Sequence, residues 1–150
     1  MKLTIALFAA MILGTTSSAQ IVARMEVKEP IPGLCDPNEV YALLPLKGQV
    51  EAVSPVTKDE ILAKLNTEIQ FLKDNPNFED KGMLGLVINC KGKVVRCKMD
   101  IKTKSEELDR QVEEVFNSLG TWKAGSLNKR EVDSSRLFSF VVKNGQISWK

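Results

Sequence analysis

The sequence contains no histidine, which removes the side chain that proteins use most often as a general base near neutral pH. The sequence also lacks a large excess of either sign of charge, because 21 basic and 19 acidic residues leave a formal net charge of only +2. This balance predicts no strong field toward nucleic acid or anionic lipid. The three cysteines match no zinc pattern. We therefore expect no metal, no cofactor and no nucleic-acid partner.

The side-chain groupings that carry catalysis are missing as well. Ser134 has no histidine to activate it, and Cys90 or Cys97 would lack an imidazole base. Glu113 and Glu114 are neighbours on a predicted helix, so their carboxylates point apart and cannot converge on one substrate atom. The sequence thus predicts a protein that is not an enzyme.

The first residues have the pattern of an export signal. Lys2 precedes an apolar run over residues 3–13, and residues 17–19 are the small side chains that signal peptidase accepts. The run is shorter than the roughly 20 residues of a membrane span. We expect a signal peptide over residues 1–19, cleavage before Gln20, and a periplasmic or secreted chain without stable membrane insertion.

Cysteine pairing is left open by the sequence. Export permits disulfides, and Cys35, Cys90 and Cys97 allow three different pairs, each leaving one thiol over. Cys90 and Cys97 lie on opposite arms of a predicted hairpin, so this local pair is the one we expect. A bond from Cys35 to either of them is the alternative, and a fully reduced chain is the third.

Residues 20–56 are predicted to form an irregular amino-terminal arm. They hold five of the six prolines, a density that excludes a long helix. Asp36-Pro37-Asn38 indicates a turn that opens a short helical turn over residues 39–44. The segment is typical of an arm that wraps around a domain rather than of a second domain.

Two amphipathic helices are predicted in the rest of the chain. The first runs over residues 57–73 and begins with a capping box formed by Thr57 and Glu60. The second begins at Ser105 and ends at Gly120. Apolar side chains recur at helical spacing in both, which indicates one buried face on each helix. They are Ile61, Leu62, Leu65, Ile69 and Leu72, then Leu108, Val112, Val115, Phe116 and Leu119.

Strands are predicted between and after the helices. Residues 84–90 and 94–101 form a hairpin around Lys91-Gly92-Lys93, and a shift of apolar parity within the second strand predicts a β-bulge between Val94 and Cys97. Trp122, after the second helix, is expected to cap the core with its indole N–H on a carbonyl.

The last strand is predicted over Leu137–Val142. Asn144-Gly145 is a two-residue turn signal, so Gln146–Trp149 would fold back as an additional strand. The consistent fold is α+β: a small antiparallel sheet of three to four strands with two helices packed on one face.

The region from Gly82 to Gly145 resembles the carboxy-terminal domain of the TonB energy transducer, in the form common in exported proteins of the Bacteroidetes type. The features that carry the likeness are the apolar strand before the glycine-lysine turn, the opening of the second helix, the tryptophan segment and the final strand. They are Lys91-Gly92-Lys93-Val94, Leu108-Asp109-Arg110, Val115-Phe116, Trp122-Lys-Ala-Gly125 and Leu127-Asn128. The helix from Thr57 matches the first helix of the family, so the likeness implies a domain over residues 57–150.

The chain departs from full TonB proteins in two respects. A cleavable signal stands where the family has a membrane anchor, and the proline-bearing arm is too short to cross a periplasm as an extended spacer. We therefore expect no energy transduction by this chain. The likeness implies instead that a protein or peptide partner adds as a strand to the edge of the last strand. The edge residues are Leu137, Phe138, Ser139, Phe140, Val141 and Val142.

Two functions follow from these observations. The first is an exported module that binds a protein or peptide, through this edge or, if Gln146–Trp149 covers it, through the exposed sheet face or the basic hairpin. The second is a structural protein that self-associates through a strand edge or through the unpaired cysteine.

Overall fold

The computed structural model describes residues 21–150, so the predicted signal peptide lies outside the described residues. The chain is α+β, as predicted, but its main sheet has six strands, more than the three to four expected. A second sheet of three short strands lies beside it. None of the helices within residues 21–150 has the length and hydrophobicity that crossing a membrane requires.

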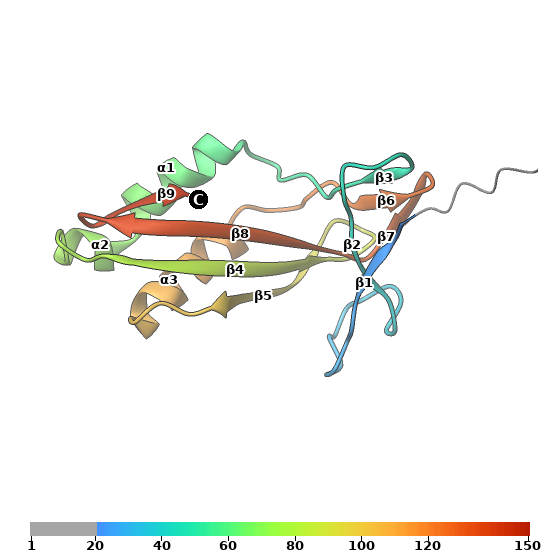
Figure 1. Cartoon of the computed structure of the whole chain (residues 1–150), viewed down its shortest axis with the longest axis horizontal. Helices are drawn as coiled ribbons and strands as arrows, with labels where there is room; N and C mark the ends of the chain where they lie inside the picture. Colours follow the sequence, from blue (N-terminus) through green and yellow to red (C-terminus); the bar gives the residue numbers. More distant parts are fainter. Residues whose placement is uncertain (1–20) are drawn as a thin grey trace, which may run out of the picture.

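Strand β8 is the centre of the main sheet (Figure 1). One of its sides pairs antiparallel with β4 over nearly its whole length, and β4 pairs in turn with β5. The other side pairs with β2 at its start and with β9 at its end, and β1 pairs with β2. The bounds are β1 Ala23–Met25, β2 Val40–Ala42, β4 Asp80–Ile88, β5 Val94–Ile101, β8 Ser134–Lys143 and β9 Gln146–Trp149.

Three helices cover one face of this sheet: α1 Lys58–Glu68, α2 Gln70–Asp74 and α3 Glu106–Asn117. Period-2 alternation places every second strand residue on the same face. The apolar residues of β4 and β8 that face the helices are fully or almost fully buried, and they form one core with the apolar stripes of the helices. The largest of them are Leu84, Leu86, Ile88 and Phe140 from the strands and Ile61, Leu65, Leu108, Val112 and Phe116 from the helices.

The predicted first helix begins where expected and then breaks. The capping box is present, with the Thr57 N–H donating to Glu60 at 2.7 Å and the Glu60 N–H donating to the Thr57 hydroxyl at 3.2 Å. Ile69 is extended, which separates α1 from α2. The Gln111 side chain of α3 accepts the Phe71 N–H at 3.0 Å, so a contact from another helix satisfies the new helix start.

The second predicted helix is confirmed as α3, with Ser105 as its N-cap and Gly120 beyond its end at a positive φ of 95°. Trp122 is buried between helix and sheet, as predicted. The prediction for its indole N–H is wrong, since this donor has no hydrogen-bond partner within the part of the chain that the structure describes.

The predicted β-bulge is present in β5. Ile88 pairs with Val94 while Val87 pairs with Arg96, so Val95 is the extra residue. Gly92 closes the hairpin at a φ of 78°, and a Cβ there would lie 1.9 Å from the Trp122 carbonyl oxygen. Only glycine fits this turn.

The arm is more regular than predicted. It contains β1, β2 and β3 (Gln49–Val50), and the short helical turn predicted over residues 39–44 is wrong because β2 pairs there with β8. Strand β3 joins β6 (Gly125–Leu127) and β7 (Arg130–Val132) in the small sheet. Tyr41, Leu43 and Val132 form a second apolar cluster beneath it. The arm is therefore built into the domain.

Candidate binding surfaces

The outer edge of β8 was predicted as the partner site, and the structure closes part of it. Strand β9 pairs with Phe140 to Lys143, and the Lys150 N–H donates to the Ser139 carbonyl at 3.1 Å. At the other end Ser134 pairs with Tyr41 of β2. Along this edge, residues 135–138 have no strand partner among the described residues.

Strand β9 is held in place from both sides. The Asn66 side chain of α1 accepts the Ile147 N–H at 2.7 Å and donates to the Ile147 carbonyl at 2.9 Å. Ile147 itself is buried in the core, and the Trp149 indole donates to the Lys58 carbonyl at 3.3 Å. One asparagine thus satisfies both backbone groups that β9 turns away from β8, and the strand is a fixed part of the sheet.

The predicted edge residues divide between two faces. Phe138, Phe140 and Val142 point into the helix-covered core. Leu137, Ser139 and Val141 alternate with them and point to the opposite face, where Leu137 is 58% exposed. Side chains from both faces therefore flank the uncovered stretch of the edge.

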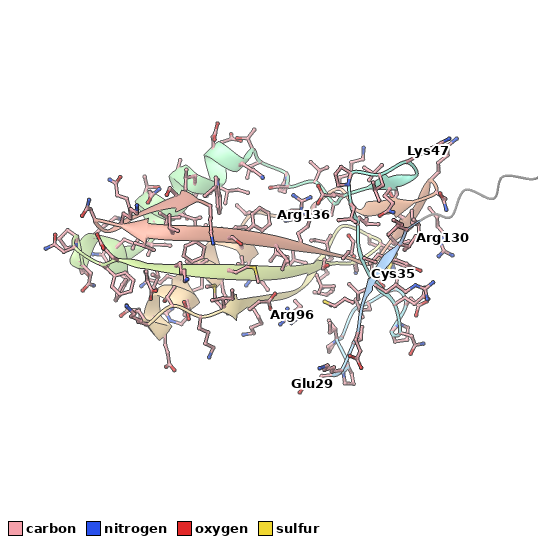
Figure 2. The ribbon with its side chains drawn as sticks, in the orientation of Figure 1. Glu29, Cys35, Lys47, Arg96, Arg130 and Arg136 are labelled. Carbon is pink, nitrogen blue, oxygen red and sulfur yellow. A yellow bond between two sulfur atoms is a disulfide. The ribbon has the colours of Figure 1, made fainter. Side chains whose placement is uncertain are left out.

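Arg136 lies at this uncovered stretch (Figure 2). Its guanidinium is 2.6 Å from the Glu51 carboxylate and 5.8 Å from the centre of the Phe138 ring. The Arg136 side chain is mostly buried while that of Glu51 is about half exposed. A charged pair thus borders the stretch on the helix side, and Leu137 borders it on the other.

The face of the sheet away from the helices is only partly covered. The arm crosses it at one end, where Gly33 packs against Val95, and Val87 is buried there. A groove of about 640 Å³ lies between residues 25–32 of the arm and β5. Glu29 on the arm and Arg96 on β5 mark its two walls (Figure 2). Beyond the groove the face is open.

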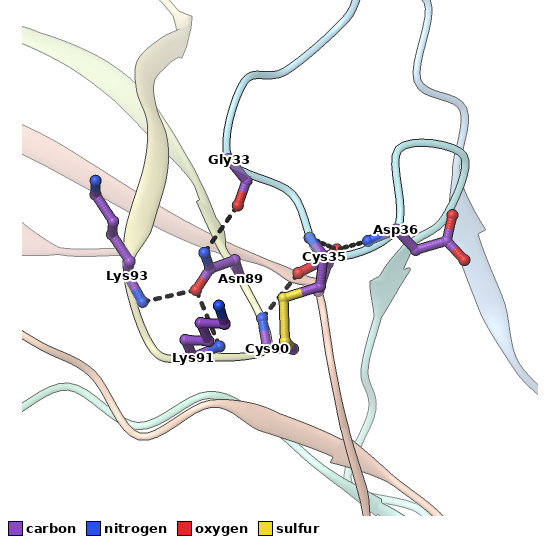
Figure 3. The surroundings of a disulfide bond; sticks show 8 residues. Gly33, Cys35, Asp36, Asn89, Cys90, Lys91 and Lys93 are labelled. Carbon is purple, nitrogen blue, oxygen red and sulfur yellow. Dashed lines mark hydrogen bonds between the residues drawn. A yellow bond between two sulfur atoms is a disulfide. The ribbon is translucent and has the colours of Figure 1, made fainter.

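The disulfide joins Cys35 to Cys90, with a Cα–Cα distance of 6.0 Å (Figure 3). The prediction of a Cys90–Cys97 bond is therefore wrong, and the alternative through Cys35 is the pair formed. Cys97 pairs in register with Leu86 and points into the core, whereas Cys90 lies beyond the end of β4 in the turn. The bond fastens the arm to the β4–β5 hairpin.

Asp133 organises the surroundings of the disulfide. Its buried carboxylate accepts the N–H groups of Cys35 at 2.7 Å, Asp36 at 2.8 Å and Cys90 at 2.8 Å. Its backbone carbonyl accepts the Tyr41 N–H at 2.9 Å. One residue thus holds both cysteines and the start of the β2–β8 pairing.

Asn89 holds the hairpin turn next to the disulfide (Figure 3). Its side chain accepts the N–H groups of Lys91 and Lys93, both at 3.0 Å, and donates to the Gly33 carbonyl at 2.8 Å. The turn of the hairpin and the arm are therefore joined by hydrogen bonds as well as by the disulfide.

Cys97 is buried under α3, where its thiol donates to the Glu113 carbonyl at 3.5 Å. Burial, together with the nearby Glu113 carboxylate, raises the pKa of this thiol to about 12. A buried thiol that stays protonated at physiological pH is a poor nucleophile and is closed to a second chain.

The ligand atoms of Cys35, Cys90 and Asp133 lie within 4.8 Å of one another, and no other such group occurs within residues 21–150. The disulfide uses both sulfur atoms, and three backbone donors bind the carboxylate. This arrangement holds the arm and offers no free metal ligand set.

Asn66 and Asp133 are two of the residues that the sequence analysis missed. Each binds backbone groups far away along the chain, and neither belongs to a recognisable local motif. A polar residue within an otherwise apolar helix stripe was the only signal for Asn66, and Asp133 had none beyond its place between two strands.

Comparison of the chain with protein-family models, with curated proteins and with solved structures gave no match.

Proposed function

We propose that this protein is an exported interaction module that binds an extended segment of a partner protein at the outer edge of β8. The observation that carries the proposal is the uncovered stretch between β2 and β9, over residues 135–138, with the exposed Leu137 at its centre. The disulfide supports an oxidising, extracytoplasmic location.

Backbone geometry favours strand addition at this stretch. Ser139 directs its carbonyl away from β4 toward Lys150. Hydrogen-bonding groups alternate in direction along an antiparallel strand, so Leu137, two residues earlier, directs its N–H and C=O the same way. An extended peptide can pair with these groups and place its side chains beside Arg136 and Leu137.

The site is short. Residues 135–138 span about 13 Å at roughly 3.3 Å per residue, and β2 and β9 bound them on either side. The resemblance to the TonB carboxy-terminal domain supports the same mode of binding, shifted along the strand because β9 covers Phe140 to Lys143. A short extended segment of about four residues fits the space.

Selection from a random peptide library, followed by one backbone variant, tests the proposal. Leu137→Pro removes the outward N–H, whereas the control Leu137→Thr keeps this donor while also shortening the side chain. Selected peptides should shift the amide signals of Ser135, Leu137 and Ser139. They should bind the unchanged protein and the Leu137→Thr variant, and they should not bind the Leu137→Pro variant. Peptides that bind both variants equally, or a library without binders, would contradict the proposal.

Self-association through a strand edge is the alternative function. Strand β1 is the outermost strand and pairs only with β2 among the described residues, so its outer edge favours this alternative. Burial of Cys97 argues against a covalent dimer through the unpaired cysteine. Sedimentation equilibrium separates the two functions, since a concentration-dependent dimer that Met25→Pro abolishes would favour self-association.

A further inference from the structure

The part of the sheet face that the arm leaves open carries a small apolar patch, which we call the open patch. It consists of Met83, Ile101, Leu137 and Val141. Met83 pairs in register with Ile101 on one side and with Ser139 on the other, and Leu137 and Val141 flank Ser139 along β8. Ile101 is 51% and Leu137 is 58% exposed. Ile101, Leu137 and Val141 are therefore each neighbours of Met83 on the face opposite the helices.

Charges around the open patch are mostly positive. The open-face positions of β4, β5, β8 and β9 carry the cations Lys81, Arg96, Lys98 and Lys143 and one carboxylate, Asp100. Arg96 lies 3.1 Å from Asp100, whose carboxylate is folded over Gly85. The single acidic group is thus already paired. Lys98 lies 3.4 Å from the Glu113 carboxylate of α3, so it is paired as well. Lys81 and Lys143 are exposed and form no ion pair within residues 21–150.

Two of the lysines lie at the end of the face that is farthest from the arm. Lys81 pairs in register with Val141, and Lys143 pairs with Gln146 of β9. The acidic residues of the arm, Glu26 and Glu29, line the groove at the opposite end. The open patch is therefore bordered by positive charge on the side where a ligand has free access.

We propose that the open patch docks an acidic amphipathic helix of a partner protein. A helix with apolar side chains on one stripe and carboxylates on its flanks would cover the patch and face Lys81 and Lys143. It would add a third layer to a sheet that now has helices on one side only.

The dimensions of the face fit this occupant. Four strands about 4.8 Å apart give a width of roughly 14 Å, which one helix of about 10 Å diameter fills. The arm closes the far end. The open stretch of β4 over residues 81–85 spans about 16 Å at roughly 3.3 Å per residue, which is about three turns of helix. A second copy of this chain is a poor occupant, because the lysines around its own open patch would lie against those of the first.

This surface shares the Leu137 side chain with the edge of β8, but the two proposals depend on different groups. Strand addition depends on the backbone N–H of Leu137, whereas helix docking depends on the lysine side chains and on apolar area. The difference between Leu137→Pro and its control Leu137→Thr therefore tests the first, and a lysine reversal tests the second. Either proposal can fail while the other holds.

The probe is a synthetic peptide of about 15 residues, a length at which an isolated helix begins to be stable, with leucines on one stripe and glutamates on both flanks. Titration into the ¹⁵N-labelled protein should shift the amide signals of Met83, Ile101 and Val141. The variant Lys81→Glu/Lys143→Glu should bind about 5- to 30-fold more weakly, since each exposed ion pair contributes up to about 1 kcal/mol. Lys58→Glu/Lys73→Glu, on the helix layer, should bind as the unchanged protein does.

Two further probes complete the test. The same peptide with lysine in place of glutamate should not bind, and binding of the acidic peptide should weaken as salt rises. Shifts confined to the helix layer, or equal binding of both peptides, would overturn the proposal. The proposal would also be overturned if the acidic peptide did not bind while phosphatidylglycerol vesicles bound the unchanged protein and did not bind the Lys81→Glu/Lys143→Glu variant.

Discussion

The two faces of one sheet have opposite environments in this protein. On the helix side Leu84 and Phe140 are at most 1% exposed, whereas on the other side Leu137 and Ile101 are more than half exposed. All four come from strands of the same sheet, and alternation along each strand separates them. The helix-covered face supplies most of the buried apolar area that stabilises the fold. The open face is covered by the arm at one end only.

Truncating one side chain on each face gives the sharpest contrast. Phe116→Ala removes a fully buried ring from the helix side of the core and should lower the free energy of unfolding by about 3–5 kcal/mol. Leu137→Ala should change it by no more than about 0.5 kcal/mol, because little buried area is lost. Urea unfolding of both variants measures the difference, and equal effects would contradict the two-face description.

The disulfide stabilises the arm more than it stabilises the helix layer. Cys35→Ser/Cys90→Ser should lower the free energy of unfolding by about 2–4 kcal/mol, because the bond closes a loop of 55 residues in sequence. Hydrogen exchange should accelerate most at the Tyr41 amide, because local opening of the arm adds there to global unfolding, and less in α3, where only global unfolding contributes. An acceleration in α3 as large as that at Tyr41 would show that the arm is not a separate unit of stability.

Asn66 joins the helix layer to the strand that covers the end of β8. Asn66→Ala leaves both Ile147 backbone groups without their partner and should cost about 1–3 kcal/mol. Thr67→Ala, which removes an exposed local hydrogen bond in the same helix, is the matched control and should cost less. Hydrogen exchange at the Ile147 amide should be faster in Asn66→Ala. Unchanged protection of this amide would contradict the role of Asn66 in holding β9.

The capping box of α1 gives the smallest effect, and it depends on pH. Hydrogen bonds from the Thr57 backbone N–H and hydroxyl lower the pKa of Glu60. The stabilisation is therefore present above the ordinary glutamate pKa of about 4.3 and is lost as the pH falls through the lowered value. When the pH falls from about 6 to about 3, the free energy of unfolding should decrease more for the unchanged protein than for the Glu60→Gln variant, which has no carboxyl group to protonate at this position. Thermal unfolding at each pH measures this, and parallel curves would contradict it.

The features that the sequence predicted correctly depend on neighbours in the chain. Thr57 and Glu60 are three residues apart, and Ser105 lies directly before its helix. The bulge follows from a shift in the alternation of apolar and polar residues within β5. The turn at Asn144 and the pairing of β9 are equally local. In each case a few adjacent residues contain the physical cause.

The features that it missed depend on contacts between distant segments. The helix breaks at Ile69, where the side chain of Gln111 satisfies the new start. Cys35 reaches Cys90 because the arm crosses the sheet, and Asp133 fixes both ends. No local pattern determines such a path.

Crosslinking in the cell that produces the protein tests most directly whether the open face is a recognition surface. A photoreactive residue is placed at Ile101 on the open face and, in a second variant, at Thr67 on the helix layer. We predict a defined protein adduct from position 101 that Lys81→Glu/Lys143→Glu abolishes, and none from position 67. The same adduct from both positions, or one from position 67 alone, would contradict the account.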